Sequence, residues 1–265
     1  MFIGKAKIKR LDTNRRAIVE VEDEVAVDEA ICLFINDDYY TTFIVSPTMI
    51  RELVIGHMVG EGIVETLNEV KAINIEPSRV LAYLNHELDP RKLIGERINI
   101  ITTACGSPGK PVRMDQFQRL PKTSNATIEP ESLWSLMVEL NRRSEAYKRT
   151  GGTHSAMLYE IKGVFNFFTE DVGRHNAIDK AIGGGLLAGV DMQKCVLVCS
   201  GRLSADMVFK VFRSRIPIVA SVAGPLESGI RVAQNLGVTL IGFVRGSRMN
   251  IYTHSERVVT EGYAI

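Results

Sequence analysis

The amino-acid sequence predicts an α/β protein in which a smaller mixed α+β domain precedes a layered α/β domain. The 265-residue chain is long enough for one large or two modest domains. From about residue 150 onward, apolar strand-like runs alternate with segments of helical periodicity, which is typical of a sheet covered by helices on both faces. Residues 114–130 are polar and irregular, so we place a domain boundary there and divide the chain into residues 1–125 and 126–265.

The first domain is expected to hold several strands and one helix. Alternating apolar and polar residues predict a strand over 17–27 and a hairpin over 31–45. Ser46 and Pro47 are typical of a helix start, with Ser46 as the N-cap, and Gly60 lies where that helix should end. Further short strands are expected over residues 70–75, 80–84 and 97–102.

The second domain is expected to alternate strands with helices. Helices are predicted over residues 132–148, 176–189, 203–214 and 225–237. Strands are predicted over residues 152–161, 163–170, 194–201, 216–222 and 238–245. In such sheets ligands bind beyond the carboxyl ends of the strands. The polar loops to consider are therefore residues 170–175, 200–204 and 245–248.

Composition excludes several classes of protein. Lys and Arg total 32 against 31 Asp and Glu, so no overall field would hold a nucleic acid or an anionic membrane. The longest weakly polar stretch, residues 181–190, is shorter than the roughly 20 residues that a membrane helix needs. The N-terminus lacks the pattern of a secretory signal, and four unevenly spaced cysteines do not form a disulfide framework. We expect a cytoplasmic protein.

One cysteine stands in a setting suited to reactivity. Cys105 lies in the Gly- and Pro-rich loop ACGSPGK, where an exposed thiol near Lys110 could ionise and act as a nucleophile. The alternative is an incidental loop cysteine. Cys32, Cys195 and Cys199 lie in apolar strands and are expected to be core residues.

Charged and glycine-containing loops predict a site for an anionic ligand. The loop with Arg174 and His175 carries charges of both signs, although a helix-capping network would explain them as well. The loop CSGRLSADM offers Arg202, hydroxyls and backbone amides to a phosphate. The segment FVRGSRMNIY combines arginines, a glycine and aromatic residues, which would suit a pyrophosphate with a stacked base.

Zinc-dependent chemistry is not expected. Zinc deaminases need a His, a Glu two residues later and a PCxxC motif, but the position two after His154 is Ala156 and the chain has no CxxC. A zinc-dependent nucleoside deaminase would hold stoichiometric metal, and we expect none. The sequence also lacks GxxxxGK[ST] and GxGxxG motifs.

The strings TGGTHSA, EDVGRHNAIDK, SGRLSADMVFK and FVRGSRMNIYTH, with SPTMIRELVIGHMVGEGIV before them, resemble the FdhD/NarQ family of formate dehydrogenase accessory sulfurtransferases. The resemblance covers nearly the whole chain. It implies a three-layer second domain similar to cytidine deaminases without the zinc site, and a homodimer. It also implies that the protein accepts persulfide sulfur from a cysteine desulfurase. That sulfur would go to the molybdenum or tungsten bis-molybdopterin guanine dinucleotide cofactor before its insertion into formate dehydrogenase.

The resemblance assigns roles to particular residues. Cys105 matches the reactive cysteine of the family, and the guanine-dinucleotide segment matches residues 243–248. The expected cofactor-binding residues are Phe243, Val244, Arg245, Gly246, Ser247, Arg248, His154, Arg174 and Arg202. His154 or His175 could carry protons.

The chain departs from the family pattern at one position. The family loop has two cysteines separated by two residues, whereas Pro108 stands at the second position here. One thiolate is enough to form a persulfide, so what becomes doubtful is a step in which a second thiol resolves it. The alternative function is a cofactor-binding chaperone for the apo-dehydrogenase that transfers no sulfur.

Overall fold

The computed structural model describes residues 2–87 and 126–263, and it contains a six-stranded mixed sheet in the second half of the chain. The order of the strands is β12-β11-β10-β9-β7-β8, with β9, β10 and β11 parallel and the other pairings antiparallel. These strands are β7 (His154–Glu160), β8 (Asn166–Asp171), β9 (Cys195–Cys199), β10 (Ile218–Ser221), β11 (Thr239–Arg245) and β12 (Arg248–Thr253).

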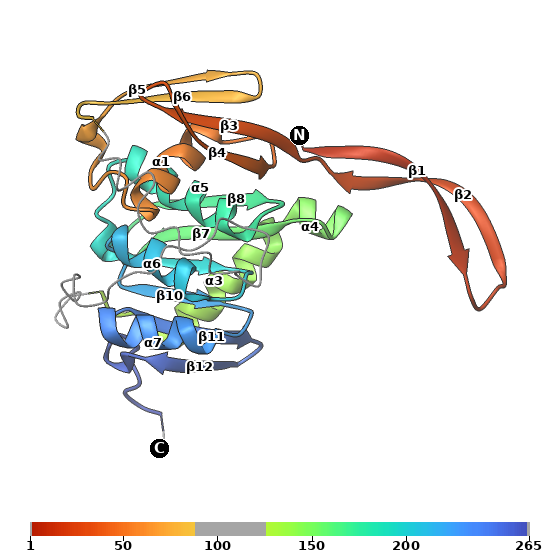
Figure 1. Ribbon diagram of the computed structural model, residues 1–265. Helices are drawn as coiled ribbons and strands as arrows, with labels where there is room; N and C mark the ends of the chain where they lie inside the picture. The colour runs from red at the N-terminus through yellow and green to blue at the C-terminus, as the bar shows by residue number, and fades with distance from the viewer. Residues whose placement is uncertain (1, 88–125, 264–265) are drawn as a thin grey trace.

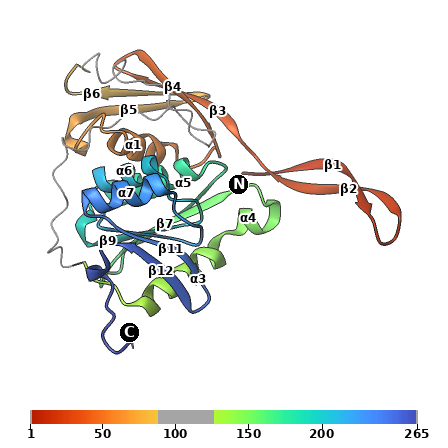
Figure 2. The ribbon, with the colours of Figure 1, turned by 60° about the horizontal axis from the view of Figure 1, so that its bottom comes forward.

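Helices cover both faces of this sheet, as Figures 1 and 2 show. One face packs against α5 (Arg174–Leu187), α6 (Ala205–Arg213) and α7 (Glu227–Leu236). The other packs against α3 (Pro130–Arg143), which α4 (Glu145–Thr150) follows. All five residues of β9, CVLVC, are buried, as expected for a parallel strand that is covered on both sides. The predicted α/β arrangement is therefore present.

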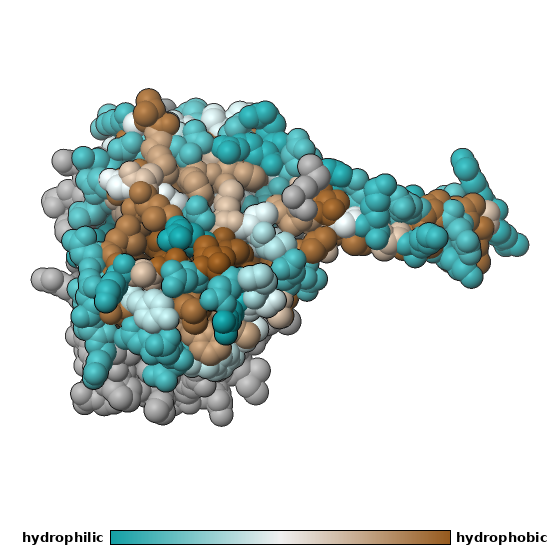
Figure 3. Space-filling view, turned by 90° about the horizontal axis from the view of Figure 1, so that it is seen from above, coloured by the Kyte–Doolittle hydropathy of each residue, from teal (hydrophilic) through white to brown (hydrophobic). Residues whose placement is uncertain are grey.

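The first half of the chain forms a four-stranded sheet with the order β4-β3-β6-β5. Its strands are β3 (Glu29–Ile35), β4 (Asp38–Val45), β5 (Val70–Glu76) and β6 (Arg79–Leu84). One face of the sheet packs against α1 (Ile50–Gly60), and alternate residues of the strands point to the outer face, seen from above in Figure 3.

Helix α1 also packs closely against α5 and so joins the two halves. A Cβ atom on Gly56 would lie 1.8 Å from the carbonyl oxygen of Asp179, and one on Gly183 would lie 1.9 Å from that of Glu52. These glycines let the two backbones touch where any side chain would collide. The predicted boundary near residue 125 adjoins the segment outside the described residues and stays a prediction.

The first two strands form an arm that projects from the body of the molecule (Figures 1 and 2). β1 (Ile3–Asp12) and β2 (Ala17–Ala26) pair with each other as a separate two-stranded sheet. No helix in residues 2–87 and 126–263 has the length and apolarity needed to cross a membrane.

Three local predictions were wrong. The helix expected over 132–148 is broken at Ser144, whose hydroxyl donates to the carbonyl of Leu140 and also contacts Ser155 Oγ at 2.6 Å. Ser46 does not cap α1; the helix begins at Ile50, and the Ser46 hydroxyl accepts the backbone N–H of Val172 instead. Residues 248–253, read as loop, form β12. The strand expected over 97–102 lies outside the described residues.

Candidate functional site

The loops singled out in the sequence meet at one edge of the six-stranded sheet. The parallel strands β9, β10 and β11 end there. β7 runs antiparallel to β9, with Ala156 opposite Cys199, so its first residue, His154, reaches the same edge. Helices α5, α6 and α7 all begin at this edge, which points their unpaired N–H groups toward any ligand held there.

His154 is half-buried at the start of β7. Its Nδ1 lies 3.2 Å from the Oγ of Ser200, which in turn accepts the backbone N–H of Ser155 at 3.0 Å. Burial, followed by the positive charges of Arg174 and His175, lowers the pKa of His154 below its ordinary value of 6.5. His154 therefore stays neutral at pH 7 and offers a hydrogen bond rather than a charge.

His175, in the first turn of α5, pairs with Asp206 in the first turn of α6. The distance between His175 Nε2 and Asp206 Oδ2 is 2.5 Å, and the Ser204 hydroxyl donates to the other oxygen of Asp206. Burial would raise the pKa of Asp206, but the hydrogen bond and charge of His175 outweigh it and hold that pKa well below 3.8. The ionised carboxylate fixes a proton on Nε2. Asp206 was not singled out in the sequence, although its place after a strand and near a helix start is a usable signal.

The arginines of the first two loops both lie at this edge. Arg174 opens α5, and its side chain lies against Gly201, where a Cβ would come within 2.9 Å of Arg174 Cβ. Arg202 follows Gly201 directly in the sequence, and it is exposed. Together they place positive charge at the starts of two helices, which favours an anion.

Phe243 lies farther along the edge, near the end of β11, in a backbone conformation with φ of +54°. Its ring packs on Gly224 so closely that a Cβ there would lie 2.6 Å from Phe243 Cζ. Arg245 Nε donates to the carbonyl of Val222 at 2.8 Å, and its guanidinium carbon lies 5.7 Å from the centre of the Phe243 ring. This half-buried ring beside a cation is a suitable platform for a planar base.

The other residues of this segment take different positions. Gly246 (φ +57°) and Ser247 form the turn between β11 and β12, and Arg245 lies opposite Arg248. Residues 245–248 are all exposed. Val244 is buried in the apolar core on the α3 side, so only its backbone is available to a ligand.

The loop of residues 222–226 lies between the side chains around His154 and those around Phe243. Sequence reasoning missed this loop. Val222 donates its N–H to Cys199, and Leu226 donates to Leu203. The order β11-β10-β9-β7 separates Phe243 from His154 by three strand spacings, about 14 Å. The small residues of the string AGP, directly after the strand predicted over 216–222, were the available signal.

Several charges of the string TEDVGRHNAIDK serve the fold. Glu170 accepts the backbone N–H groups of Ala146 and Tyr147 at the start of α4. Asp171 accepts from the fully buried Lys180 at 2.5 Å. Glu170, Asp171 and Lys180 therefore form the helix-capping and ion-pair network that was the alternative to a binding site.

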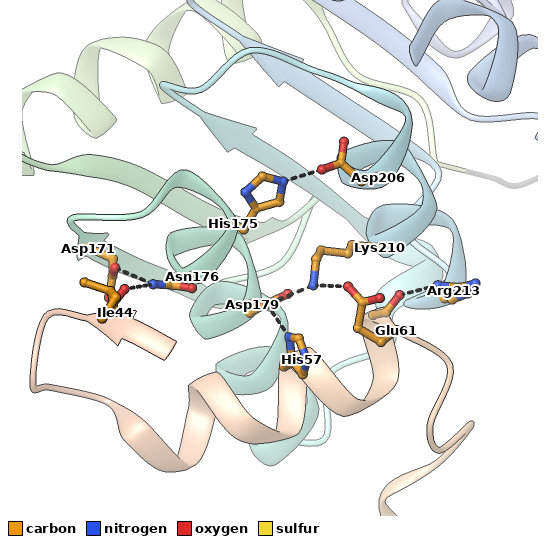
Figure 4. A network of polar contacts seen from close by, with 11 residues as sticks. Ile44, His57, Glu61, Asp171, His175, Asn176, Asp179, Asp206, Lys210 and Arg213 are labelled. Carbon is orange, nitrogen blue, oxygen red and sulfur yellow. Dashed lines mark hydrogen bonds and ion pairs between the residues drawn. The ribbon is translucent and has the colours of Figure 1, made fainter. Parts of the chain in front are cut away.

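A second buried charge cluster lies behind the edge, where α1, α5 and α6 meet (Figure 4). Lys210 Nζ lies 2.9 Å from Asp179 Oδ2 and 2.8 Å from Glu61 Oε1, and His57 Nδ1 lies 3.2 Å from the same Asp179 oxygen. Burial raises the pKa of Glu61, but the charges of Lys210, His57 and Arg213 outweigh it and lower that pKa to about 2.

The cysteines differ in accessibility. Cys105 lies outside the described residues. Cys195 and Cys199 are buried, as predicted, and burial raises their pKa values to about 12 and about 11. Cys32 is only half-buried on the outer face of the four-stranded sheet, so its assignment to the core was wrong; alternation along β3 turns its neighbours inward instead. Within the described ranges, no three His, Cys, Asp or Glu side chains are grouped as metal ligands.

The fold and this edge define the class: an α/β protein with a basic, aromatic loop edge suited to an anionic ligand. The model of the FdhD/NarQ family matches residues 26–259. The chain belongs to the FdhD/NarQ family.

Curated relatives and a solved structure agree with this assignment. The chain is 36% identical over 263 residues to the sulfur carrier protein FdhD of Wolinella succinogenes, covering 97% of this chain and 90% of that protein. It is 33% identical over 267 residues to the sulfur carrier protein FdhD of Thermoplasma acidophilum, covering 97% and 95%. The crystal structure of a formate dehydrogenase accessory protein from Desulfotalea psychrophila superimposes with a TM-score of 0.80 at 25% identity, covering 98% of this chain and 100% of that chain.

Proposed function

We propose that this protein is a sulfur carrier for formate dehydrogenase that holds sulfur as a persulfide on Cys105. It passes that sulfur to the molybdenum or tungsten bis-molybdopterin guanine dinucleotide cofactor before the cofactor enters the dehydrogenase. The observation that carries the proposal is the row of basic and aromatic side chains along one sheet edge, in a chain whose curated relatives are named sulfur carriers.

The edge supports binding of the nucleotide end of this substrate. Phe243 supplies a ring for the guanine, with Arg245 beside it. Arg202, which follows β9 two strands away, and Arg174, which follows β8, supply charge for phosphates. Exposed Gly246, Ser247 and Arg248 offer backbone and side-chain donors, Val244 offers its backbone, and neutral His154 offers a hydrogen bond.

Loading sulfur onto the protein needs one thiolate. The Cys105 thiolate attacks the terminal sulfur of a donor persulfide, a new S–S bond forms, the donor S–S bond breaks, and the donor leaves as a thiolate. Cys195 and Cys199 are poor candidates because burial keeps them protonated at neutral pH.

The first experiment is intact mass spectrometry after incubation with a cysteine desulfurase and cysteine. Wild type should gain about 32 Da, the mass of one sulfur atom on a thiol. Cys105→Ala should not gain it, while Cys32→Ala, which removes the half-buried thiol, should behave like wild type. An adduct that persists in Cys105→Ala would place the persulfide elsewhere.

The second candidate function is favoured by Pro108, which replaces the second cysteine of the family loop. As a chaperone, the protein would bind the cofactor and dock on the apo-dehydrogenase without moving sulfur. Maturation of formate dehydrogenase by Cys105→Ala separates the two: loss of maturation supports sulfur transfer, and unchanged maturation supports the chaperone.

Cofactor binding is tested with guanosine diphosphate. Arg245→Ala should weaken its affinity by about tenfold or more, the effect of losing a charge-assisted hydrogen bond. Arg142→Ala on α3, an exposed arginine paired with Glu139 on the opposite face, is the control and should leave affinity unchanged. Equal affinities for all three proteins would remove the edge from the proposal.

The remaining parts of the proposal concern partners and setting. A cysteine desulfurase donates the sulfur, formate dehydrogenase receives the loaded cofactor, and the protein acts as a homodimer in the cytoplasm. The likeness of the second domain to cytidine deaminases without zinc belongs to the same proposal, and metal analysis of the purified protein tests its zinc-free part.

A further inference from the structure

The carboxylate of Asp171 lies at the centre of a hydrogen-bond network beside the sheet edge. Asp171 is the last residue of β8, and its side chain is fully buried. Its Oδ1 accepts the backbone N–H of Gly173 at 2.8 Å and the side-chain amide of Asn176 at 2.9 Å. Its Oδ2 accepts the backbone N–H of Ser46 at 3.2 Å and the ammonium group of Lys180 at 2.5 Å. These four bonds fill the acceptor positions of a carboxylate, so Asp171 has none left for a ligand.

The first half of the chain supplies further partners, at the end of β4. The Ser46 hydroxyl accepts the backbone N–H of Val172 at 3.1 Å, and the Ser46 carbonyl accepts from Lys180 Nζ at 2.9 Å. The carbonyl of Ile44 accepts from Asn176 Nδ2 at 2.8 Å, as Figure 4 shows. One amide nitrogen of Asn176 therefore joins the end of β4 to the end of β8.

The residues that this network holds in place are Arg174 and His175. They lie between Gly173 and Asn176, and both of these flanking residues bond to the buried carboxylate. The Asn176 side chain folds back over the turn, because a Cβ on Gly173 would lie 2.8 Å from its Nδ2. Gly173 is the N-cap of α5 and has no side chain with which to cap the helix. The position of the first turn of α5 therefore depends on Asn176.

The position of this turn sets the charge at the sheet edge. The Arg174 side chain packs over Gly201, where a Cβ would lie 2.9 Å from Arg174 Cβ. His175 lies 2.5 Å from Asp206 on α6. After burial, the charge of Arg174 is the largest cause that lowers the pKa of His154. Because charge–charge interactions weaken with distance, the pKa of His154 reports where Arg174 lies.

We propose that Asn176 and Ser46 are positioning residues for the anion site at the sheet edge: through the turn of residues 172–175 they place Arg174 and His175 for the ligand. A segment of the first half thus controls a site that is built on the second half. Donors that are already in place bind more tightly, because less conformational freedom is lost on binding. The class of ligand rests on the proposed function, whereas the positioning of the turn does not.

Asn176→Ala tests the proposal in the full chain, because it removes both side-chain hydrogen bonds and changes no charge. Its affinity for guanosine diphosphate, measured by calorimetry, should fall by about three- to tenfold, since losing these bonds lowers the fraction of protein with the turn in place. The pKa of His154, followed by NMR titration, should rise toward 6.5 as Arg174 moves away. Ser46→Ala should shift both quantities in the same directions, because it removes the acceptor of the Val172 N–H.

Asn166→Ala is the matched control. Asn166 begins β8 at the end away from the sheet edge, about 16 Å along the strand from Asp171, and it accepts a hydrogen bond from Arg143. This variant loses an asparagine hydrogen bond on the same strand without touching the turn. It should match wild type in both measurements.

Combining Asn176→Ala with Arg174→Gln shows whether Asn176 acts through Arg174. When the arginine charge is already gone, loosening the turn should weaken binding by less than about twofold. Full additivity, an unchanged affinity or an unchanged His154 pKa in Asn176→Ala, or equal effects in Asn166→Ala would each overturn the proposal. If wild type binds no guanosine diphosphate, the proposed function fails at its cofactor step, and the pKa of His154 alone decides whether Asn176 positions the turn.

Discussion

Replacing Lys210 with methionine would leave the buried carboxylate of Asp179 and the half-buried carboxylate of Glu61 without their shared cation. Lys210 is 3% exposed, and its Nζ lies 2.9 Å from Asp179 and 2.8 Å from Glu61. Burial alone would lower the pKa of Lys210, but the charges of Asp179 and Glu61 outweigh it and raise that pKa above 10.5. The ammonium group is therefore charged at every pH of interest, and the cluster depends on it.

The size of the loss follows from breaking a buried ion pair. Removing one partner of such a pair costs about 3–5 kcal/mol, because the remaining charge stays buried. Methionine keeps the apolar stem, so packing should change little. Lys210→Met should lower the free energy of unfolding by about 3–5 kcal/mol at pH 7, measured by urea unfolding.

Arg142→Met is the matched control, since it removes a cation from an exposed pair with Glu139. It should leave the urea midpoint unchanged because exposed pairs contribute little. A loss below about 1 kcal/mol in Lys210→Met would refute the reasoning, since surface substitutions fall in that range.

Three further predictions rest on the same structure. The lowered pKa of Glu61, about 2 against an ordinary 4.5, contributes stability above pH 4.5 that is lost as pH falls toward 2. Between pH 6 and pH 2 the free energy of unfolding of wild type should fall by up to about 3 kcal/mol more than that of Glu61→Gln. Equal losses in unfolding titrations of the two proteins would contradict this. Gly224→Ala should displace the Phe243 ring and weaken guanosine diphosphate binding several-fold by calorimetry, whereas the exposed Gly151→Ala, with open space around its Cβ, should not; unchanged binding in Gly224→Ala would separate the ring from the ligand. Arg174→Gln should raise the pKa of His154, followed by NMR titration, but leave it below 6.5 because burial remains, and a pKa that does not move would show that the Arg174 charge is not felt there.

The sequence was most informative where local pattern and packing agree. The apolar runs of β9, β10 and β11 and the helices between them are recognisable because a buried parallel sheet needs continuous apolar strands. The strand β12 was not predicted because a turn follows Arg245. Met249 and Ile251 nevertheless alternate with polar residues, as in a β-strand, and they pack on the apolar core. A period-two reading of MNIYT would have found it.

Tertiary contacts account for what the sequence could not show. Lys210 looks like a surface residue on a helix, yet it is buried because Asp179 and Glu61, which are distant in sequence, neutralise it. Ser144 interrupts a periodic helix through its contact with Ser155 on another element. At the candidate site, the loops could be located from strand ends, but the bond between His175 and Asp206 joins residues 31 positions apart that share no local pattern.

The crossing of α1 and α5 at Gly56 and Gly183 has a consequence for how the molecule unfolds. The backbones touch there, and the cluster beside them takes charges from both halves of the chain. Separating the halves would expose that contact and leave those charges without their partners. Opening one half alone therefore costs a large free energy. We expect one cooperative transition in which the four-stranded sheet and the α/β layers melt together. A ligand bound at the sheet edge would then protect amide hydrogens on the far side of α1 from exchange.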